Sequence, residues 1–296
     1  YQYREVCFLT GKPIILEGTM TVKKNVRQGK TNTTYNYNLV NEQQNATLTR
    51  VVVMDTETVT KENGQTTETS TITTKPTEKF KVGDTIYTLT DYRFSRSGIT
   101  DPKPAVLYNA GEYKLTKTYV IDNSNSKVIV VMEGNQYGFD QYWSSAKSST
   151  VSLDISASPE DSPAWGGFAQ VVVSSAAKKG FRYIENQPWQ ISFEGGYVEQ
   201  NWDESVLEYN ATLPEFDKNG NATEVMKDYQ ERLGLNTEPV NTRLMVPDLK
   251  HLKGHWAEES AKILFSLEVI PGTGESFIPE KYVTRSEFTA MVVRAV

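Results

Sequence analysis

The chain has 296 residues, enough for two or three domains, and carries a net charge of −6 from 31 Lys and Arg against 37 Asp and Glu. Phosphate binding favours basic side chains that outnumber the acidic ones, so this balance excludes a broad nucleic-acid surface. No apolar run approaches the roughly eighteen residues that a membrane-spanning helix needs.

Cysteine and histidine usage narrows the chemistry further. The single cysteine, Cys7, excludes an intrachain disulfide and a cysteine-based metal site, and its place on an early strand is typical of a small buried side chain. Both histidines, His251 and His255, lie near the C-terminus. Residues 1–250 therefore lack the commonest general base and the commonest zinc ligand. We predict no catalytic residue, no metal site and no cofactor, and hence no enzymatic activity.

Residues 1–157 predict a domain built of antiparallel strands. Thr, Val, Tyr and Ile are abundant there, and residues 1–9 alternate around Cys7 before Gly11 turns the chain. Residues 47–60 and 66–74 flank Asn63-Gly64, a dipeptide that tolerates the positive φ angles of a tight hairpin turn. Residues 113–121 and 127–132 predict another hairpin. The fold class that follows is mainly β, with an antiparallel β-sandwich-like N-terminal region.

The threonine-rich hairpin at residues 56–77 has almost no large apolar side chain on its returning strand, where Ile72 is the exception. Such a strand cannot bury a face against a core, so we expect it to project as a polar arm, which is either solvated without a partner or paired with another copy of the chain. Residues 1–9 are the second candidate for a strand shared between copies.

Residues 158–235 predict a second β-rich region, either separate or part of the first domain. Pro and Gly concentrate at residues 158–167, and short strand-like segments follow. The region is predicted to end in a helix over 221–233, with Asn221 as its cap, Val225, Tyr229 and Leu233 on one face, and Gly234 as its stop. Residues 236–246, which contain a proline and no periodic pattern, form the predicted linker.

Residues 247–296 predict a helix, a loop and a second helix. Trp256, Ile263 and Leu267 share one face of the first helix. Thr284 and Glu287 form a T-x-x-E capping box at the start of the second helix, whose apolar stripe comprises Phe288, Met291, Val292 and Ala295. The sequence stops inside this stripe, so we expect the natural protein to continue.

This C-terminal segment resembles the S-layer homology (SLH) motif, which fastens bacterial surface proteins to cell-wall polysaccharide. The positions that carry the resemblance are Asp248, His255-Trp256-Ala257, Ile263, Leu267, Gly272, Phe277, Pro279, Thr284-Arg285, Glu287-Phe288 and Arg294. The resemblance implies an extracellular location, at the cell surface in the wall or S-layer, and a secondary cell-wall polysaccharide as partner. The motif usually occurs in threes that pack as a pseudo-trimer, whereas this sequence contains one copy.

In the family the polysaccharide, often carrying a pyruvate ketal, sits in grooves between adjacent motifs. The resemblance makes Arg285 the contact to the anionic group, assisted by Trp256, Asp248 and Gly272. A guanidinium can grip a carboxylate through two parallel hydrogen bonds, and an aromatic face suits the C–H side of a sugar. Trp256 can alternatively belong to the core, and Asp248 can cap the first helix. Glu268 departs from the family, where glycine is usual.

Two other regions contain candidate binding or catalytic groups. Residues 217–221 have oxygen side chains at the first three spacings of a calcium loop, but Ala222 and Asp228 replace two residues that the loop requires, so a turn is the simpler interpretation. Residues 185–204 combine acidic and aromatic side chains, a mixture that is typical of a glycosidase cleft or a sugar-binding surface. The carboxylates are Glu185, Glu194, Glu199, Asp203 and Glu204, and the aromatic residues are Trp189, Tyr197 and Trp202.

Three classes of function remain. The first is a structural surface protein, a subunit of an S-layer or filament whose β-rich region binds other copies of itself and whose SLH motif binds the wall. The second is a wall-anchored carbohydrate-binding module, and the third is a wall-tethered glycoside hydrolase. We expect the first, because the β-rich region is joined to a motif that is typical of wall-attached surface proteins. The absence of histidine and of an unambiguous nucleophile in residues 1–245 argues against the third.

Overall fold

The computed structural model describes residues 1–27, 30–122, 124–184, 196–236 and 238–295. Thirteen strands of these residues form one antiparallel sheet, in which β1 to β12 follow each other in chain order and β13 pairs with β11 beyond the end of β12. The strands are β1 (Gln2–Cys7), β2 (Ile14–Arg27), β3 (Lys30–Asn41), β4 (Ala46–Thr60), β5 (Thr66–Val82), β6 (Thr85–Lys103), β7 (Val106–Ile121), β8 (Lys127–Asp140), β9 (Ser144–Ser158), β10 (Trp165–Ile184), β11 (Gly196–Phe216), β12 (Ala222–Asn236) and β13 (Val240–Arg243). The described helices follow as η1 (Lys250–Leu252), α1 (Glu258–Ser266) and α2 (Arg285–Ala295), and none of them is long and apolar enough to cross a membrane.

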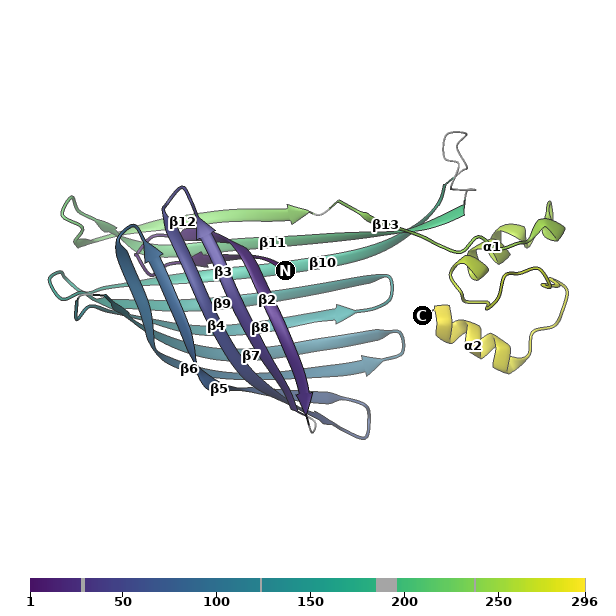
Figure 1. Cartoon of the computed structure of the whole chain (residues 1–296), viewed down its shortest axis with the longest axis horizontal. Helices are drawn as coiled ribbons and strands as arrows, with labels where there is room; N and C mark the ends of the chain where they lie inside the picture. Colours follow the sequence, from purple (N-terminus) through teal and green to yellow (C-terminus); the bar gives the residue numbers. More distant parts are fainter. Residues whose placement is uncertain (28–29, 123, 185–195, 237, 296) are drawn as a thin grey trace.

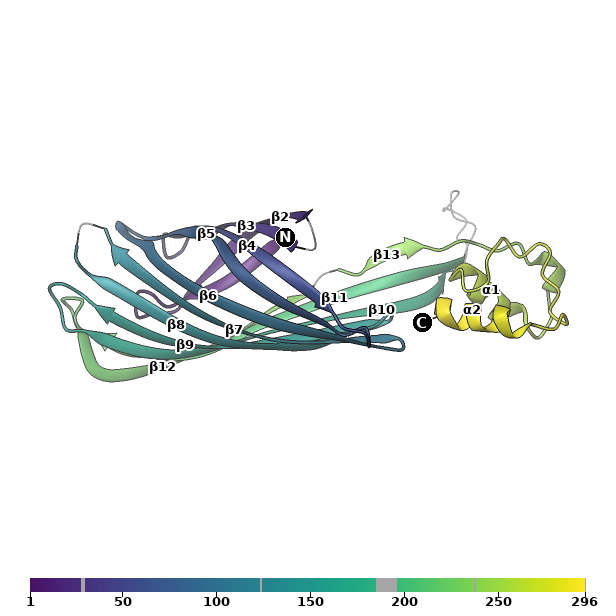
Figure 2. The same cartoon turned by 90° about the horizontal axis from the view of Figure 1, so that it is seen from below.

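The sheet curls over on itself. Figure 1 shows β2 to β6 running diagonally across β7 to β11, and Figure 2 shows the same two groups from below. Such curling needs local bends, and the ladder has register shifts near Val53, between Ser70 and Lys79, and near Leu89. Pro76, which has no N–H to donate, lies inside the interruption between β5 and β6. One folded sheet therefore produces the predicted sandwich-like arrangement.

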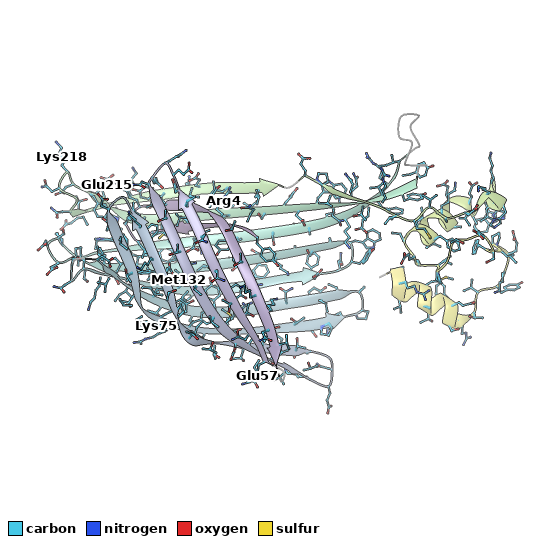
Figure 3. The ribbon with its side chains drawn as sticks, in the orientation of Figure 1. Arg4, Glu57, Lys75, Met132, Glu215 and Lys218 are labelled. Atoms are coloured by element: carbon cyan, nitrogen blue, oxygen red, sulfur yellow. The ribbon has the colours of Figure 1, made fainter. Side chains whose placement is uncertain are left out.

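The main hydrophobic core lies between the layers, at the end of the sheet that Lys218 marks in Figure 3. Its largest fully buried side chains are Phe80, Leu16, Leu39, Leu48 and Leu213. The N-terminal strand and the residues after it add Val6, Cys7, Phe8 and Leu9 to this core. Because β1 pairs with β2 and these four residues are buried, residues 1–9 are not a free terminus as expected, whereas their pairing with another copy stays a prediction.

The opposite ends of the long strands, toward Glu57 in Figure 3, extend beyond the core. On β6, for example, only Tyr87 and Leu89 are buried, and the residues that follow them are partly or fully exposed. The accessible surface of the chain is 18623 Å², whereas a compact monomer of 33.3 kDa has about 12,600 Å². The excess reflects a sheet that is only partly covered.

A network of charged side chains crosses the interior of the sheet. Arg50 on β4 donates two hydrogen bonds to Glu78 on β5, at 2.7 and 2.9 Å, and two to Glu5 on β1, both at 2.7 Å. Glu78 also accepts hydrogen bonds of 2.8 Å from the Lys117 ammonium and the Tyr119 hydroxyl on β7. The two cations and two carboxylates compensate each other, and together they join strands of both layers.

The structure corrects the predicted helix at residues 221–233, which is strand β12. Its pairing with β11 places Tyr229 and Leu233 against the core. Residues spaced by four lie on one face of a helix, but because four is an even number they also lie on one face of a strand. The pattern of Val225, Tyr229 and Leu233 therefore fits both, and pairing with β11 selects the strand.

Other predicted boundaries also change. Residues 236–246, the predicted linker, contain β13, which pairs with β11. The expected arm at residues 56–77 is wrong, because its returning strand, β5, pairs with β6 as well as with β4. The hairpin turn at Asn63-Gly64 is confirmed, with Gly64 at φ 81°. The β9–β10 ladder carries the sheet across residue 157, so residues 1–157 and 158–235 form one unit.

Candidate functional site

The C-terminal motif has a small core of its own. Leu249, Leu252, Ala261 and Phe265 are buried and pack against Met245, Ile270 and Phe277. The rings of Phe265 and Phe277 meet edge to face, with their centroids 5.4 Å apart. This core fixes the loops around α1 and so positions the predicted site residues.

Trp256 lies just before α1 rather than on its buried face. Its side chain is 85% exposed, so the alternative that it belongs to the core is wrong. The neighbouring His255 holds this segment in place, because its Nε2 lies 3.0 Å from Glu280 Oε1. The indole of Trp256 is consequently open to a ligand.

Asp248 and the loop of Gly272 come together through the backbone. The Asp248 N–H donates to the Thr273 carbonyl at 2.8 Å, and the Asp248 carboxylate lies 3.4 Å from the Lys250 ammonium. Gly272 has φ 103°, a conformation that favours glycine. A Cβ on Gly274 would lie only 2.7 Å from the Leu249 side chain, so the loop needs both glycines.

Arg285 is the first residue of α2 and is exposed. Among the described residues its guanidinium has no hydrogen-bond or ion-pair partner. The capping box before it is confirmed: the Thr284 N–H donates to Glu287 at 2.8 Å, and the Glu287 N–H donates to Thr284 Oγ1 at 3.2 Å. The bond from the Thr284 N–H, with that from its hydroxyl, holds the pKa of Glu287 below its usual value. An unpaired cation at a helix N-terminus is unfavourable, whereas a bound anion there is stabilised.

The apolar stripe of α2 is uncovered. Within the described part of the chain none of its side chains is buried, and Phe288 and Val292 are 63% and 45% exposed. The structure therefore joins Asp248 to the Gly272 loop and exposes Trp256 and Arg285, and it leaves one face of the motif without a partner.

Two histidine contacts were not predicted from the sequence. His251 Nε2 lies 2.9 Å from the Phe277 carbonyl, and His255 binds Glu280. Both contacts tie the segment before α1 to the loop after it. The histidine of the H-W-A triplet, one of the positions that carry the SLH resemblance, was an available signal, but nothing in the sequence identified Glu280 as its partner.

The suggested calcium loop is a turn between β11 and β12. Asp217 Oδ1 accepts hydrogen bonds from the backbone N–H groups of Asn221 at 2.9 Å and Asn219 at 2.8 Å. These bonds, that from Asn221 first, hold the pKa of Asp217 below its usual value. No group of three or more His, Cys, Asp or Glu in the described residues could hold a metal ion.

The candidate glycosidase carboxylates are dispersed. Glu185, Glu194 and Trp189 lie outside the described residues. On β11, Glu204 lies on the face opposite to Glu199 and Asp203, which are about 13 Å apart along the same face, because a strand rises about 3.3 Å per residue. Paired carboxylates of glycosidases lie about 5 to 10 Å apart. These three acids of β11 are not arranged in that way.

Comparison with known proteins finds a family for the C-terminal part of the chain alone. A family model of the S-layer homology domain matches residues 248–289, a segment that contains Asp248, Trp256, Gly272 and Arg285. No curated protein and no solved structure matches the chain. The match indicates a surface protein that is anchored to the cell wall.

Proposed function

We propose that this chain is a structural surface protein that binds cell-wall polysaccharide through its SLH domain and other copies of itself through its sheet. The observation that carries the first half is the SLH match over residues that include an exposed and unpaired Arg285. The second half rests on the large surface of the partly covered sheet.

In the proposed complex, the Arg285 guanidinium forms two parallel hydrogen bonds with a carboxylate substituent of the polysaccharide. The positive end of the α2 dipole adds to this attraction. The exposed ring of Trp256 packs against a sugar face, and the loop of Gly272 lets the backbone approach the ligand.

The uncovered stripe of α2 supports a site shared between motifs. Phe288 and Val292 of this stripe are exposed, and apolar residues grouped in this way mark contact surfaces. In the proposed arrangement a second SLH motif packs on this stripe, and the polysaccharide lies in the groove between the two.

Binding of soluble wall polysaccharide, released from bacterial sacculi by acid, tests the anchoring proposal. We expect Arg285→Ala to weaken binding by about tenfold or more and Arg285→Lys to restore only part of it, because lysine cannot form the two parallel bonds. Lys281→Ala, at another exposed cation of the motif, is the matched control. Equal binding by Arg285→Ala and the unaltered chain would refute the role of Arg285.

We also propose that the chain has no hydrolytic activity. The three candidate carboxylates described on β11 lie on opposite faces or far apart, and the only histidines of the chain lie in the SLH domain. A screen against wall and plant polysaccharides checks this. Turnover that is lost in Glu194→Gln or Asp203→Asn would replace the structural function with a glycosidase.

A further inference from the structure

The far ends of β8 to β11 carry a cluster of aromatic rings. Tyr142 and Trp143, in the turn between β8 and β9, are 41% and 37% exposed, and their rings meet edge to face at 5.0 Å. Tyr183 on β10 is 52% exposed and contacts the ring of Tyr197 at 5.3 Å. Phe181 stacks on Tyr197 with its ring centroid at 4.6 Å. We call these five residues the aromatic patch.

Strand register places the patch around three polar residues, Lys179, Glu199 and Asn201, which we call the polar centre. Lys179 lies opposite Asn201, Phe181 opposite Glu199, and Tyr183 opposite Tyr197, so all of them share one face of the sheet. The Lys179 backbone N–H donates to the Trp143 carbonyl at 2.9 Å, which holds the turn against β10.

The polar centre is held in a fixed arrangement. The Lys179 ammonium lies 4.2 Å from the centre of the Tyr142 ring and 4.0 Å from Glu199 Oε1. The Asn201 amide donates to Glu199 Oε1 at 3.0 Å. Burial, and then the neighbouring Glu199 carboxylate, raise the pKa of Tyr142. Donors and acceptors thus lie beside the exposed rings of Tyr142, Trp143 and Tyr183, whereas the Tyr197 ring of the patch is buried.

This combination fits an uncharged polysaccharide. The flat C–H faces of β-linked pyranose rings pack on aromatic rings, and their hydroxyls bond to the ammonium, carboxylate and amide groups between them. Because Lys179 and Glu199 are opposite charges at close range, these two described side chains bring no excess charge that would attract an ion. Its ligand differs in this respect from the anionic group assigned to Arg285.

The patch is continuous with the SLH domain. The Tyr197 hydroxyl donates to Glu259 of α1 at 2.9 Å, and the Leu244 N–H donates to the Tyr197 carbonyl at 3.0 Å. A chain anchored through the SLH domain would hold this face close to the wall. We propose that the aromatic patch is a second glycan site, which binds the β-linked glycan strands of peptidoglycan; this choice of ligand rests on the wall attachment proposed above.

Sacculi stripped of their secondary polysaccharide by acid separate the two sites, because the ligand of Arg285 is then absent. We expect the full chain to sediment with stripped sacculi. The double variant Tyr142→Ala, Trp143→Ala should bind about tenfold more weakly, as expected when anchoring aromatics are truncated. Trp143→Phe, which keeps a ring, should retain most of the binding.

Matched controls make the test specific. Tyr137 is 60% exposed but lies on the opposite face, since it pairs with Ser148 and through it with Ser174. Tyr137→Ala and Arg285→Ala should therefore bind stripped sacculi like the unaltered chain, and the protection of the buried Cys7 thiol reports the folding of each variant. The proposal is overturned if the unaltered chain does not bind, if the double variant binds equally well, or if Arg285→Ala abolishes binding. Retention by a soluble β-1,4-glucan without binding to stripped sacculi would also overturn it, because the ligand would then not belong to the wall.

Discussion

Glu78 shows how one buried carboxylate holds both layers of the sheet together. Its side chain is 1% exposed and accepts hydrogen bonds from Arg50, Lys117 and Tyr119. We expect Glu78→Gln to lower the free energy of unfolding by about 3–5 kcal/mol, because the buried Lys117 ammonium loses its carboxylate partner and the buried Arg50 guanidinium keeps only Glu5. Urea denaturation measures this. Glu133→Gln, which breaks an exposed pair with Lys114, should leave the midpoint nearly unchanged, and a similar loss in both variants would contradict the role of burial.

The same carboxylate makes stability depend on pH. Burial would raise the pKa of Glu78, but the charges of Arg50 and Lys117 outweigh it and hold the pKa well below the ordinary value of 4.5. A lowered folded-state pKa contributes stability above the unfolded pKa, and this contribution is lost as the pH falls, because the unfolded chain takes up the proton first. The free energy of unfolding should therefore fall between about pH 5 and pH 3, and fall less in Glu78→Gln. Parallel slopes for the two proteins would contradict this assignment.

Cys7 reports whether the N-terminal strand is in place. Burial raises the pKa of its thiol to about 12, and only the thiolate is a good nucleophile. The native chain should therefore react very slowly with a disulfide reagent at pH 8 and rapidly in denaturing urea. Fast reaction of the native chain would mean that β1 leaves the core easily.

At the scale of single elements, the end of α1 contains an avoidable strain. Glu268 has φ 56°, and its N–H donates to the Phe265 carbonyl at 2.9 Å, the geometry in which helices usually end on glycine. We expect Glu268→Gly to stabilise the SLH domain by about 1 kcal/mol, because a side chain in this conformation costs about that much. Hydrogen exchange of the α1 amides should slow by about fivefold. Glu268→Ala removes the same charge but keeps the strain, so a gain of equal size there would contradict the explanation.

Local patterns predicted some elements and failed for others for a physical reason. Hairpins such as the one at Asn63-Gly64 were predictable because both alternation and turn chemistry are local. Strand β12 was not predictable, because apolar residues spaced by four fit a helix and a strand alike. Only its pairing with β11 determines that the segment is a strand. The ordered spacing of the SLH positions likewise predicted the capping box at Thr284 and the motif itself.

The charged network could not be predicted. Glu5, Arg50, Glu78 and Lys117 stand on four strands, and each looks like an ordinary solvated residue in an alternating segment. Their contact depends on how the sheet curls, which is a property of the whole chain. The exposure of Trp256 could not be predicted either, because it depends on the residue at which α1 begins.

At the scale of the molecule, the two edges of the sheet differ. β1 is short, and beyond it β2 presents exposed Lys23 and Lys24, which discourage pairing with another chain. β12 is 15 residues long, and in the described structure it pairs only with β11. Val225 and Leu235 on it are 57% and 46% exposed. A long edge with exposed apolar side chains is suited to pairing, so we place the proposed contact between copies at β12.

Charge pattern suggests a register for this contact. If two β12 strands pair antiparallel about Tyr229, each Lys227 lies directly opposite Glu231 of the other copy, a favourable cross-strand pair. On the other face, Asp228 accepts a hydrogen bond from Thr212 and Arg232 binds Glu208. Glu231 accepts a hydrogen bond from the Tyr209 hydroxyl through Oε2, and a carboxylate can accept a further bond from Lys227 of the other copy. The two copies would then form one continuous sheet across a two-fold axis.

Sedimentation velocity over a range of concentrations tests both the contact and its register. The unaltered chain should associate, whereas Lys227→Glu or Glu231→Lys alone should remain monomeric, because like charges would face each other across the edge. Mixing these two variants should restore association, since the introduced glutamate of one variant then faces the introduced lysine of the other. Val131→Lys adds a charge at an exposed valine on β8 that pairs with Thr116 of β7 and Asp154 of β9, and should change nothing. Association that survives both single reversals, or that mixing fails to restore, would rule out this register.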